Sequence, residues 1–167
     1  MSSRPGVEAV EDRGALLACL AAYVLTGQIG ALWLVSPDGA EGPLAWAVRA
    51  APMALLASAT GALVGLLAFL ALRQGRRLGL PEPALWAAGA LLPPLLGWLV
   101  LLVGSELGSG SLDGPALLIG TAWFCLAGTP VAALAAHRRS VRGVAAAVSA
   151  GIAALAALVL LAGLFAG

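Results

Sequence analysis

Five apolar runs, each about as long as a membrane-spanning helix, take up most of this chain. They cover residues 14–35, 50–72, 84–103, 115–136 and 144–166. A hydrocarbon core about 30 Å thick takes roughly 20 helical residues to cross. Because backbone groups in lipid must be satisfied within their own segment, and the runs lack the alternation of barrel strands, helix is the expected state. The sequence therefore predicts an all-α membrane protein, a polytopic bundle of five transmembrane helices.

The composition agrees with this class of protein. Hydrophobic residues make up 61% of the chain and charged residues 10%, and the mean hydropathy is +1.00. Soluble domains are about one quarter charged, and a soluble monomer tolerates far less exposed apolar surface. The net charge of only +1 argues against nucleic acid as a partner. All basic residues are arginine in a chain rich in Ala, Gly and Leu, which suggests a GC-rich, bacterial genome.

Arginine is distributed asymmetrically between the connections. It precedes the first run, follows the second and separates the fourth from the fifth, at Arg4, Arg13, Arg73, Arg76, Arg77, Arg138, Arg139 and Arg142. The other two connections carry the acids Asp38, Glu41, Glu106 and Asp113. Short loops rich in arginine stay on the cytoplasmic side. We therefore expect a multi-pass protein of the plasma membrane with its N-terminus in the cytoplasm and its C-terminus outside.

The N-terminal segment differs from the rest of the chain. Residues 1–13 are polar and are expected to be disordered in the cytoplasm, whereas 14–167 form the five-helix transmembrane domain. The first run has 22 residues, which exceeds the 7–15 of a cleavable signal peptide. We expect it to be a retained membrane anchor.

The sequence contains no motif that carries catalysis. G-x-S-x-G, H-E-x-x-H and P-loop patterns are absent, and the single histidine, His137, has no nearby set of metal ligands. Cys19 and Cys125 form no C-x-x-C pair. No Asp or Glu lies inside a predicted span, so the usual carboxylates of ion-coupled carriers are missing. We expect no enzymatic activity, no catalytic residues, no cofactor and no metal site.

Arg49 is the only arginine outside the asymmetric pattern. It lies at the outer edge of the second predicted span, with Trp46 nearby. The favoured interpretation is a marker of the membrane boundary, where a long cationic side chain can reach water. The alternative is contact with an anion, a lipid phosphate or the carboxylate of a partner.

Small and polar residues indicate where helices approach one another. Gln28 and Thr26 form the polar spot of the first span, and we expect them to bond neighbouring helices rather than a substrate. Gly61 and Gly65 form a G-x-x-x-G pair in the second span, which favours close packing within the bundle or against another chain.

Pro93 and Pro94 interrupt the third predicted span. Proline removes a backbone donor and clashes with the preceding turn, so a kink is expected between Leu92 and Leu95. The kink either shapes a cavity or fits one helix around another, and the second account is favoured. The connections 32–43 and 101–115 resemble each other, which leaves open whether the first two spans duplicate the third and fourth.

Two functions remain open from the sequence. The favoured one is a non-enzymatic structural or accessory membrane protein that associates with other membrane helices in a homo- or hetero-oligomer within the lipid bilayer. It rests on missing chemistry and abundant small-residue faces. The alternative is a small permease or channel protomer for an uncharged or anionic solute, based on the interrupted third span, Arg49 and the possible repeat.

Overall fold

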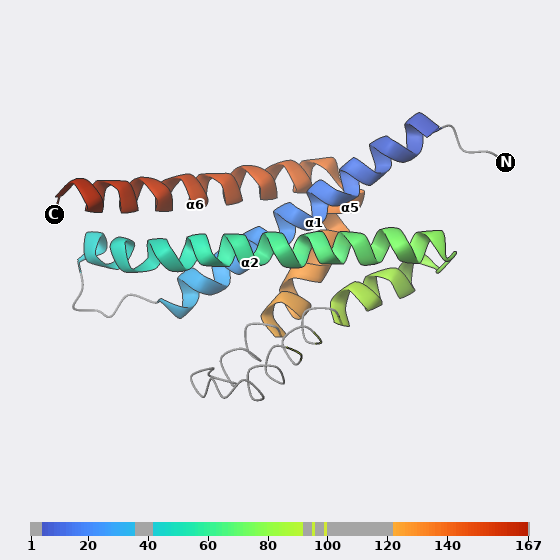
Figure 1. The fold of residues 1–167 in the computed structure, drawn as a ribbon, viewed down its shortest axis with the longest axis horizontal. Coiled ribbons are helices and arrows are strands. Elements are labelled where there is room, and N and C mark those ends of the chain that lie inside the picture. Colours follow the sequence, from blue (N-terminus) through green and yellow to red (C-terminus); the bar gives the residue numbers. More distant parts are fainter. Residues whose placement is uncertain (1–4, 36–41, 92–94, 96–98, 100–121, 167) are drawn as a thin grey trace.

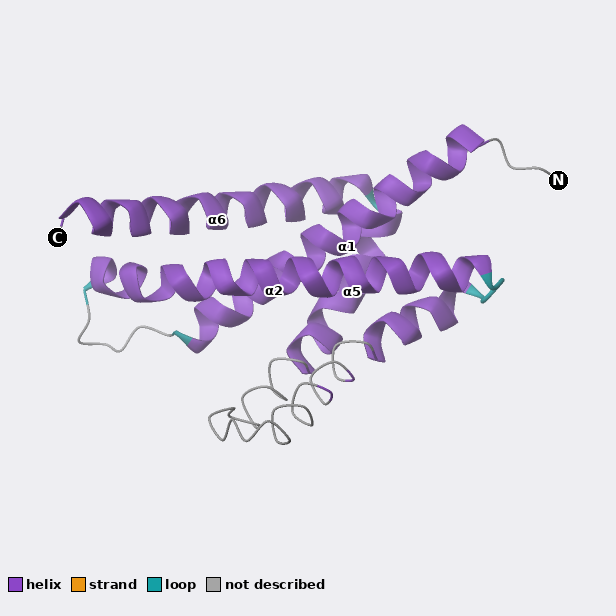
Figure 2. Cartoon of the chain, viewed as in Figure 1, coloured by secondary structure: helices purple, strands orange, loops and turns teal. Residues whose placement is uncertain are grey.

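The computed structural model describes residues 5–35, 42–91, 95, 99 and 122–166, and every regular element in these ranges is a helix (Figures 1 and 2). The elements are α1 (Pro5–Leu34), α2 (Pro43–Arg77), the π-helical turn η1 (Phe124–Gly128), α5 (Thr129–His137) and α6 (Arg139–Ala166). Residues 82–91 are helical as well.

Three of these helices are long and apolar enough to cross a membrane. The segments are Asp12–Leu34, Pro43–Arg77 and Arg139–Phe165, with mean hydropathies of 1.8, 2.2 and 2.5. They correspond to the first, second and fifth predicted spans, which confirms these three as helices of membrane-spanning length. Of the third and fourth predicted spans, only residues 84–91, 95, 99 and 122–136 lie within the described ranges.

α1 is longer than the first predicted span. It begins at Pro5, so residues 5–13, which the sequence predicts to be disordered, are helical. A proline at the first helical position costs no hydrogen bond, and adding turns to an established helix costs far less than nucleating one. An ion pair between Arg73 and Asp12 ties this extension to the end of α2.

α2 also extends beyond its predicted span, and a glycine ends it. Gly79 has a φ of +72°, a conformation that residues with a Cβ rarely adopt. The Gly79 amide donates to the Arg76 carbonyl at 3.0 Å, and the Leu80 amide donates to the Gly75 carbonyl at 3.1 Å. This pair of bonds is the Schellman arrangement, which satisfies the last carbonyls of the helix. The turn sends residues 82–91 back along α2 (Figure 1).

α1 and α6 run in the opposite direction to α2, and α1 crosses α2 obliquely (Figure 1). The main core lies between α1, α2, the η1–α5 segment and the start of the 82–91 helix, and includes Tyr23, Phe69, Leu85 and Ala132. A smaller cluster of Ala51, Ala54 and Ala156 joins α2 to α6.

The prolines of the described spans have different effects. Pro130 lies at the start of α5, directly after η1. Its ring would collide with the carbonyl four residues earlier, and the wider π turn relieves this clash. Pro52 lies inside α2, which continues as one helix. Pro93 and Pro94, where the kink is predicted, and the 101–115 part of the possible repeat lie outside the described residues.

Candidate functional site: a cavity at the arginine-rich end

The arginine groups of three separate segments meet at one end of the bundle. Arg73 on α2 pairs with Asp12 on α1, with 3.2 Å between Nε and Oδ2. Arg142 on α6 donates from Nη1 to the Gly14 carbonyl of α1 at 3.0 Å. These contacts bring the start of α1, the end of α2 and the start of α6 together, although they are far apart in the sequence.

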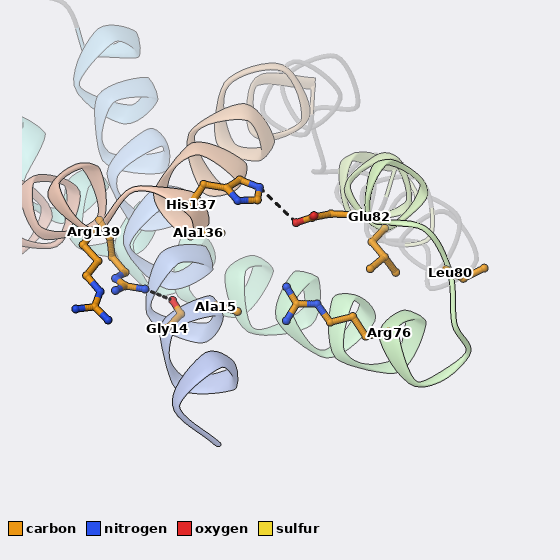
Figure 3. Close-up of a pocket in the computed structure, with 10 residues that line it drawn as sticks. Gly14, Ala15, Arg76, Leu80, Glu82, Ala136, His137 and Arg139 are labelled. Atoms are coloured by element: carbon orange, nitrogen blue, oxygen red, sulfur yellow. Dashed lines mark hydrogen bonds and ion pairs between the residues drawn. The ribbon is translucent and has the colours of Figure 1, made fainter. Parts of the chain in front are cut away.

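A cavity of about 750 Å³ lies at this end, and we call it the arginine cavity (Figure 3). Its lining comes from α1, the end of α2, the segment after it and the α5–α6 junction: Gly14, Ala15, Arg76, Leu80, Glu82, Leu85, Ala136, His137, Arg139 and Arg142. The wall therefore combines cationic side chains with aliphatic ones.

The charges around the arginine cavity are unbalanced. Three arginines face one carboxylate, Glu82, which leaves the lining at +2 when His137 is neutral. Glu82 already has a partner, because its Oε1 lies 3.3 Å from Nε2 of His137. Figure 3 shows this contact bridging the 82–91 helix and the end of α5.

Local backbone features place Glu82 and Leu85 at the cavity. The turn at Gly79 reverses the chain, and the amides of Ala84 and Leu85 then donate to the Pro81 carbonyl, which starts the next helix. Gly75 allows this helix to pack closely, since a Cβ at Gly75 would lie 2.2 Å from Leu85 Cδ2. The sequence feature that signals this corner is the run of Gly and Pro over residues 79–83.

The predicted polar spot lies in a second region, buried between α1, α2 and α6. The Gln28 side chain is fully buried, and its Nε2 donates to Ser58 Oγ at 2.8 Å and to the Ser149 carbonyl at 3.0 Å. Ser58 in turn donates to the Ala54 carbonyl at 2.7 Å. Gln28 Oε1 has no hydrogen-bond partner among the described residues. The Gln28 amide thus connects three helices.

Thr26 lies near Gln28 but has a different set of contacts. Its hydroxyl donates within α1, to the carbonyls of Ala22 at 2.9 Å and Tyr23 at 3.2 Å. The Thr26 carbonyl accepts from the Trp123 indole at 2.7 Å. Beside it, the Tyr23 hydroxyl and Thr129 Oγ1 lie 2.8 Å apart. The polar groups of this part of α1 therefore hold the η1–α5 segment in place.

Gly61 and Gly65 lie where α2 crosses α1. A Cβ on Gly61 would lie 2.5 Å from the Tyr23 carbonyl oxygen, and one on Gly65 would lie 2.9 Å from that of Cys19. Both obstacles are backbone atoms, which cannot move aside as a flexible side chain can. The structure thus uses this G-x-x-x-G pair for packing inside the chain.

Arg49 is far from the arginine cavity. It is exposed in the second turn of α2, because the helix begins at Pro43 rather than at the predicted residue 50. The 27 positions between Arg49 and Arg76 correspond to about 40 Å along the helix. Near the same end as Arg49, the Trp46 indole donates to the Val35 carbonyl and ties α2 to the end of α1.

Sequence reasoning singled out Gln28 and Thr26 but not the residues they meet. Ser58, Ser149 and Trp123 carry no local signal of a shared contact, since they lie on three other segments. For the arginine clusters, the sequence favours a role in membrane topology over attraction of anionic lipid headgroups, and the pattern does not reveal that arginines from separate segments line one cavity.

The described ranges contain no group of three or more His, Cys, Asp and Glu residues able to hold a metal ion. No family model matches the chain, and no curated protein sequence or solved structure does either.

Proposed function

We propose that this chain is a non-enzymatic integral membrane protein that acts as an accessory component by associating with other membrane helices. The observation that carries the proposal is the exposure of α6. In the most apolar stretch of Arg139–Phe165, only 17% of the residues are buried, against 50% in the corresponding stretch of Asp12–Leu34. An apolar helix with so few intramolecular contacts has one face available to lipid or to another helix.

The exposed face of α6 carries small residues in its first half and large apolar ones, such as Leu158 and Leu161, in its second half. Gly143, Ala147, Ala150, Gly151 and Ala154 are all exposed and share one side of the helix. A Cβ at Gly143 or Gly151 would meet nothing within 4 Å. Small residues in a membrane helix allow a second backbone to approach closely, and in this chain Gly61 and Gly65 already serve that purpose against α1. The occupant that fits the α6 face is therefore another transmembrane helix.

The polar side chains inside the bundle support this function over the permease or channel. The Gln28 amide donates across helices to the Ser58 hydroxyl and to the Ser149 backbone carbonyl, and the Tyr23 hydroxyl contacts that of Thr129. The Ser149 hydroxyl donates to the Ala146 carbonyl within α6. Apart from Gln28 Oε1, these polar groups are hydrogen-bonded within the bundle, whereas a solute pathway needs polar groups that face an open passage.

The topology in this proposal is the one that the arginine distribution favours. The arginine-rich end of the bundle faces the cytoplasm, the plasma membrane is crossed five times, and the C-terminus lies outside. α6 then spans the membrane with its small-residue turns in the cytoplasmic half.

The test is extraction in a mild detergent, followed by mass spectrometry of the proteins that co-purify with wild type and with Gly151→Leu. Wild type is expected to co-purify with a stoichiometric membrane partner or with a second copy of the chain. Gly151→Leu places a large side chain in the middle of the α6 face, and we expect the association to fall at least tenfold.

Gly163→Leu is the matched control. Gly163 is also open on α6 but lies near its C-terminal end, away from the small-residue turns. We expect this variant to keep the association. A wild-type monomer without a partner, or equal association in all three proteins, would contradict the proposal.

A further inference from the structure

Among the described residues, Arg76 and Arg139 are the arginines of the cavity lining whose side chains form no ion pair or hydrogen bond. Glu82 is held by His137, Asp12 by Arg73, and Arg142 by the neutral Gly14 carbonyl. Within the described part of the chain, the Arg76 guanidinium forms no ion pair or side-chain hydrogen bond. Figure 3 shows its side chain reaching from α2 toward Ala15 on α1. A guanidinium in this position offers its full set of donors to the cavity.

The chemistry of the cavity wall suits an oxyanion. The planar fork of an arginine matches the oxygens of a phosphate and can bind them in a bidentate manner. Arg139 and Arg142 also line the cavity, so three cations attract an anion that enters it. His137 can add a donor from the end of α5.

The size of the cavity indicates more than a bare ion. A volume of about 750 Å³ is in the range that holds organic ligands and exceeds the needs of inorganic phosphate. Ala15, Leu80, Leu85 and Ala136 supply an apolar part of the lining. A ligand that fills this space carries a phosphate at one end and an apolar or glycerol-like body at the other.

We propose that the arginine cavity binds the phosphate group of an anionic amphiphile, with Arg76 as the principal ligand and Arg139 and Arg142 in support. A phospholipid headgroup is the expected source, because the cavity lies at the end of apolar helices where headgroups gather. This inference uses residues other than the exposed α6 face and does not depend on the accessory function.

The experiment measures lipid retention by native mass spectrometry of the full chain in neutral detergent, titrated with phosphatidylglycerol or phosphatidylcholine. Wild type is expected to retain one phosphatidylglycerol and to bind it at least tenfold more tightly than phosphatidylcholine. Arg76→Gln is expected to bind phosphatidylglycerol about tenfold more weakly than wild type, since a charge-assisted bond to phosphate is removed.

Arg77→Gln is the matched control, because it removes the same charge one residue further on. Arg77 is exposed and does not line the cavity. We expect its affinity to stay within twofold of wild type. An equal loss in Arg76→Gln and Arg77→Gln would show general attraction by surface charge and would overturn the proposal.

A second variant guards against a folding defect in Arg76→Gln. Glu82→Gln removes the only carboxylate of the lining and should tighten phosphatidylglycerol binding several-fold. Weaker or unchanged binding in this variant would count against an anion site.

The source of the phosphate is distinguished by calorimetric titration with glycerol 1-phosphate and inorganic phosphate. If the lipid is the ligand, both bind at least tenfold more weakly than phosphatidylglycerol. If glycerol 1-phosphate binds as tightly as phosphatidylglycerol, and its binding depends on Arg76, the cavity is a phosphate site for a water-soluble ligand. If none of these probes binds, the proposed site is rejected.

Discussion

At the scale of single residues, the main structural polar group is the Gln28 amide. Its two hydrogen bonds reach α2 and α6, while its carbonyl oxygen, Oε1, accepts no hydrogen bond in the described ranges. Interhelical hydrogen bonds in membranes average only about 0.6 kcal/mol, so Gln28 is better understood as fixing the helix arrangement than as a large source of stability. Thr26 and Ser58 back-bond to their own helices, which satisfies their hydroxyls locally.

Gln28→Ala is expected to lower the free energy of unfolding by about 1–3 kcal/mol, through two lost hydrogen bonds and the cavity left by the side chain. Unfolding by sodium dodecyl sulfate in mixed micelles, followed by circular dichroism, measures the change. Gln74→Ala is the control, since Gln74 is exposed near the end of α2. We expect that variant to stay within about 0.5 kcal/mol of wild type, and similar losses in both would contradict the role of Gln28.

At the scale of elements, this chain uses small residues in two ways. On α2, Gly61 and Gly65 let α1 approach until a Cβ would collide with its backbone. On α6, Gly143 and Gly151 face open space. The two sets look alike in sequence, because both repeat at helical spacing in alanine-rich segments. Only the packing shows that the α2 glycines contact α1, whereas the α6 glycines contact no other part of the chain.

The same substitution is therefore expected to have opposite effects on the two helices. Gly61→Ala forces α1 and α2 apart and should destabilise the fold by about 1–3 kcal/mol, as overpacking does. Gly151→Ala meets no atom within 4 Å and should be neutral or stabilising by up to about 1 kcal/mol, through helix propensity. Thermal unfolding of both variants in detergent measures this difference. Equal midpoints for Gly61→Ala and wild type would show that the α1–α2 crossing is looser than described.

At the scale of the whole molecule, the arginine-rich ends of α1, α2 and α6 lie together. Arg73–Asp12 and Arg142–Gly14 are direct contacts between these ends. The opposite end carries Arg49, Trp46 and the start of α2. A bundle with one strongly basic end is what a multi-pass protein needs for a single orientation in the membrane.

The proposed orientation predicts the accessibility of single cysteines in a background without Cys19 and Cys125. Gly42→Cys, just before α2, should react with a membrane-impermeant maleimide in intact cells. Ser140→Cys, at the start of α6, should react only after permeabilisation. Ser109→Cys, which lies outside the described residues, should react like Gly42→Cys if the membrane is crossed five times. The reverse pattern at Gly42 and Ser140 would invert the topology, and protection of Ser109 would reduce the number of spans.

Much of the fold could be predicted because membrane insertion depends on local hydrophobicity. The spans that include Tyr23, Val64 and Ala156 were placed by the length and polarity of their own segments. The boundaries were less accurate, because α2 continues through Arg49 at one end and to Arg77 at the other. Arginine and proline suggest a boundary, yet both are tolerated within a helix near an interface.

Long apolar helices and an asymmetric distribution of arginine follow directly from the amino-acid sequence, since hydropathy and charge are properties of each local segment. The tertiary structure alone decided that Gln28 meets Ser58 and Ser149, and that Arg76 shares a cavity with Arg142. The partners in these sets are separated by tens of residues, and their contact depends on how each helix is rotated and where it crosses the next. Apolar helices in lipid have many nearly equivalent rotations, and close packing at glycines and a few hydrogen bonds select one of them.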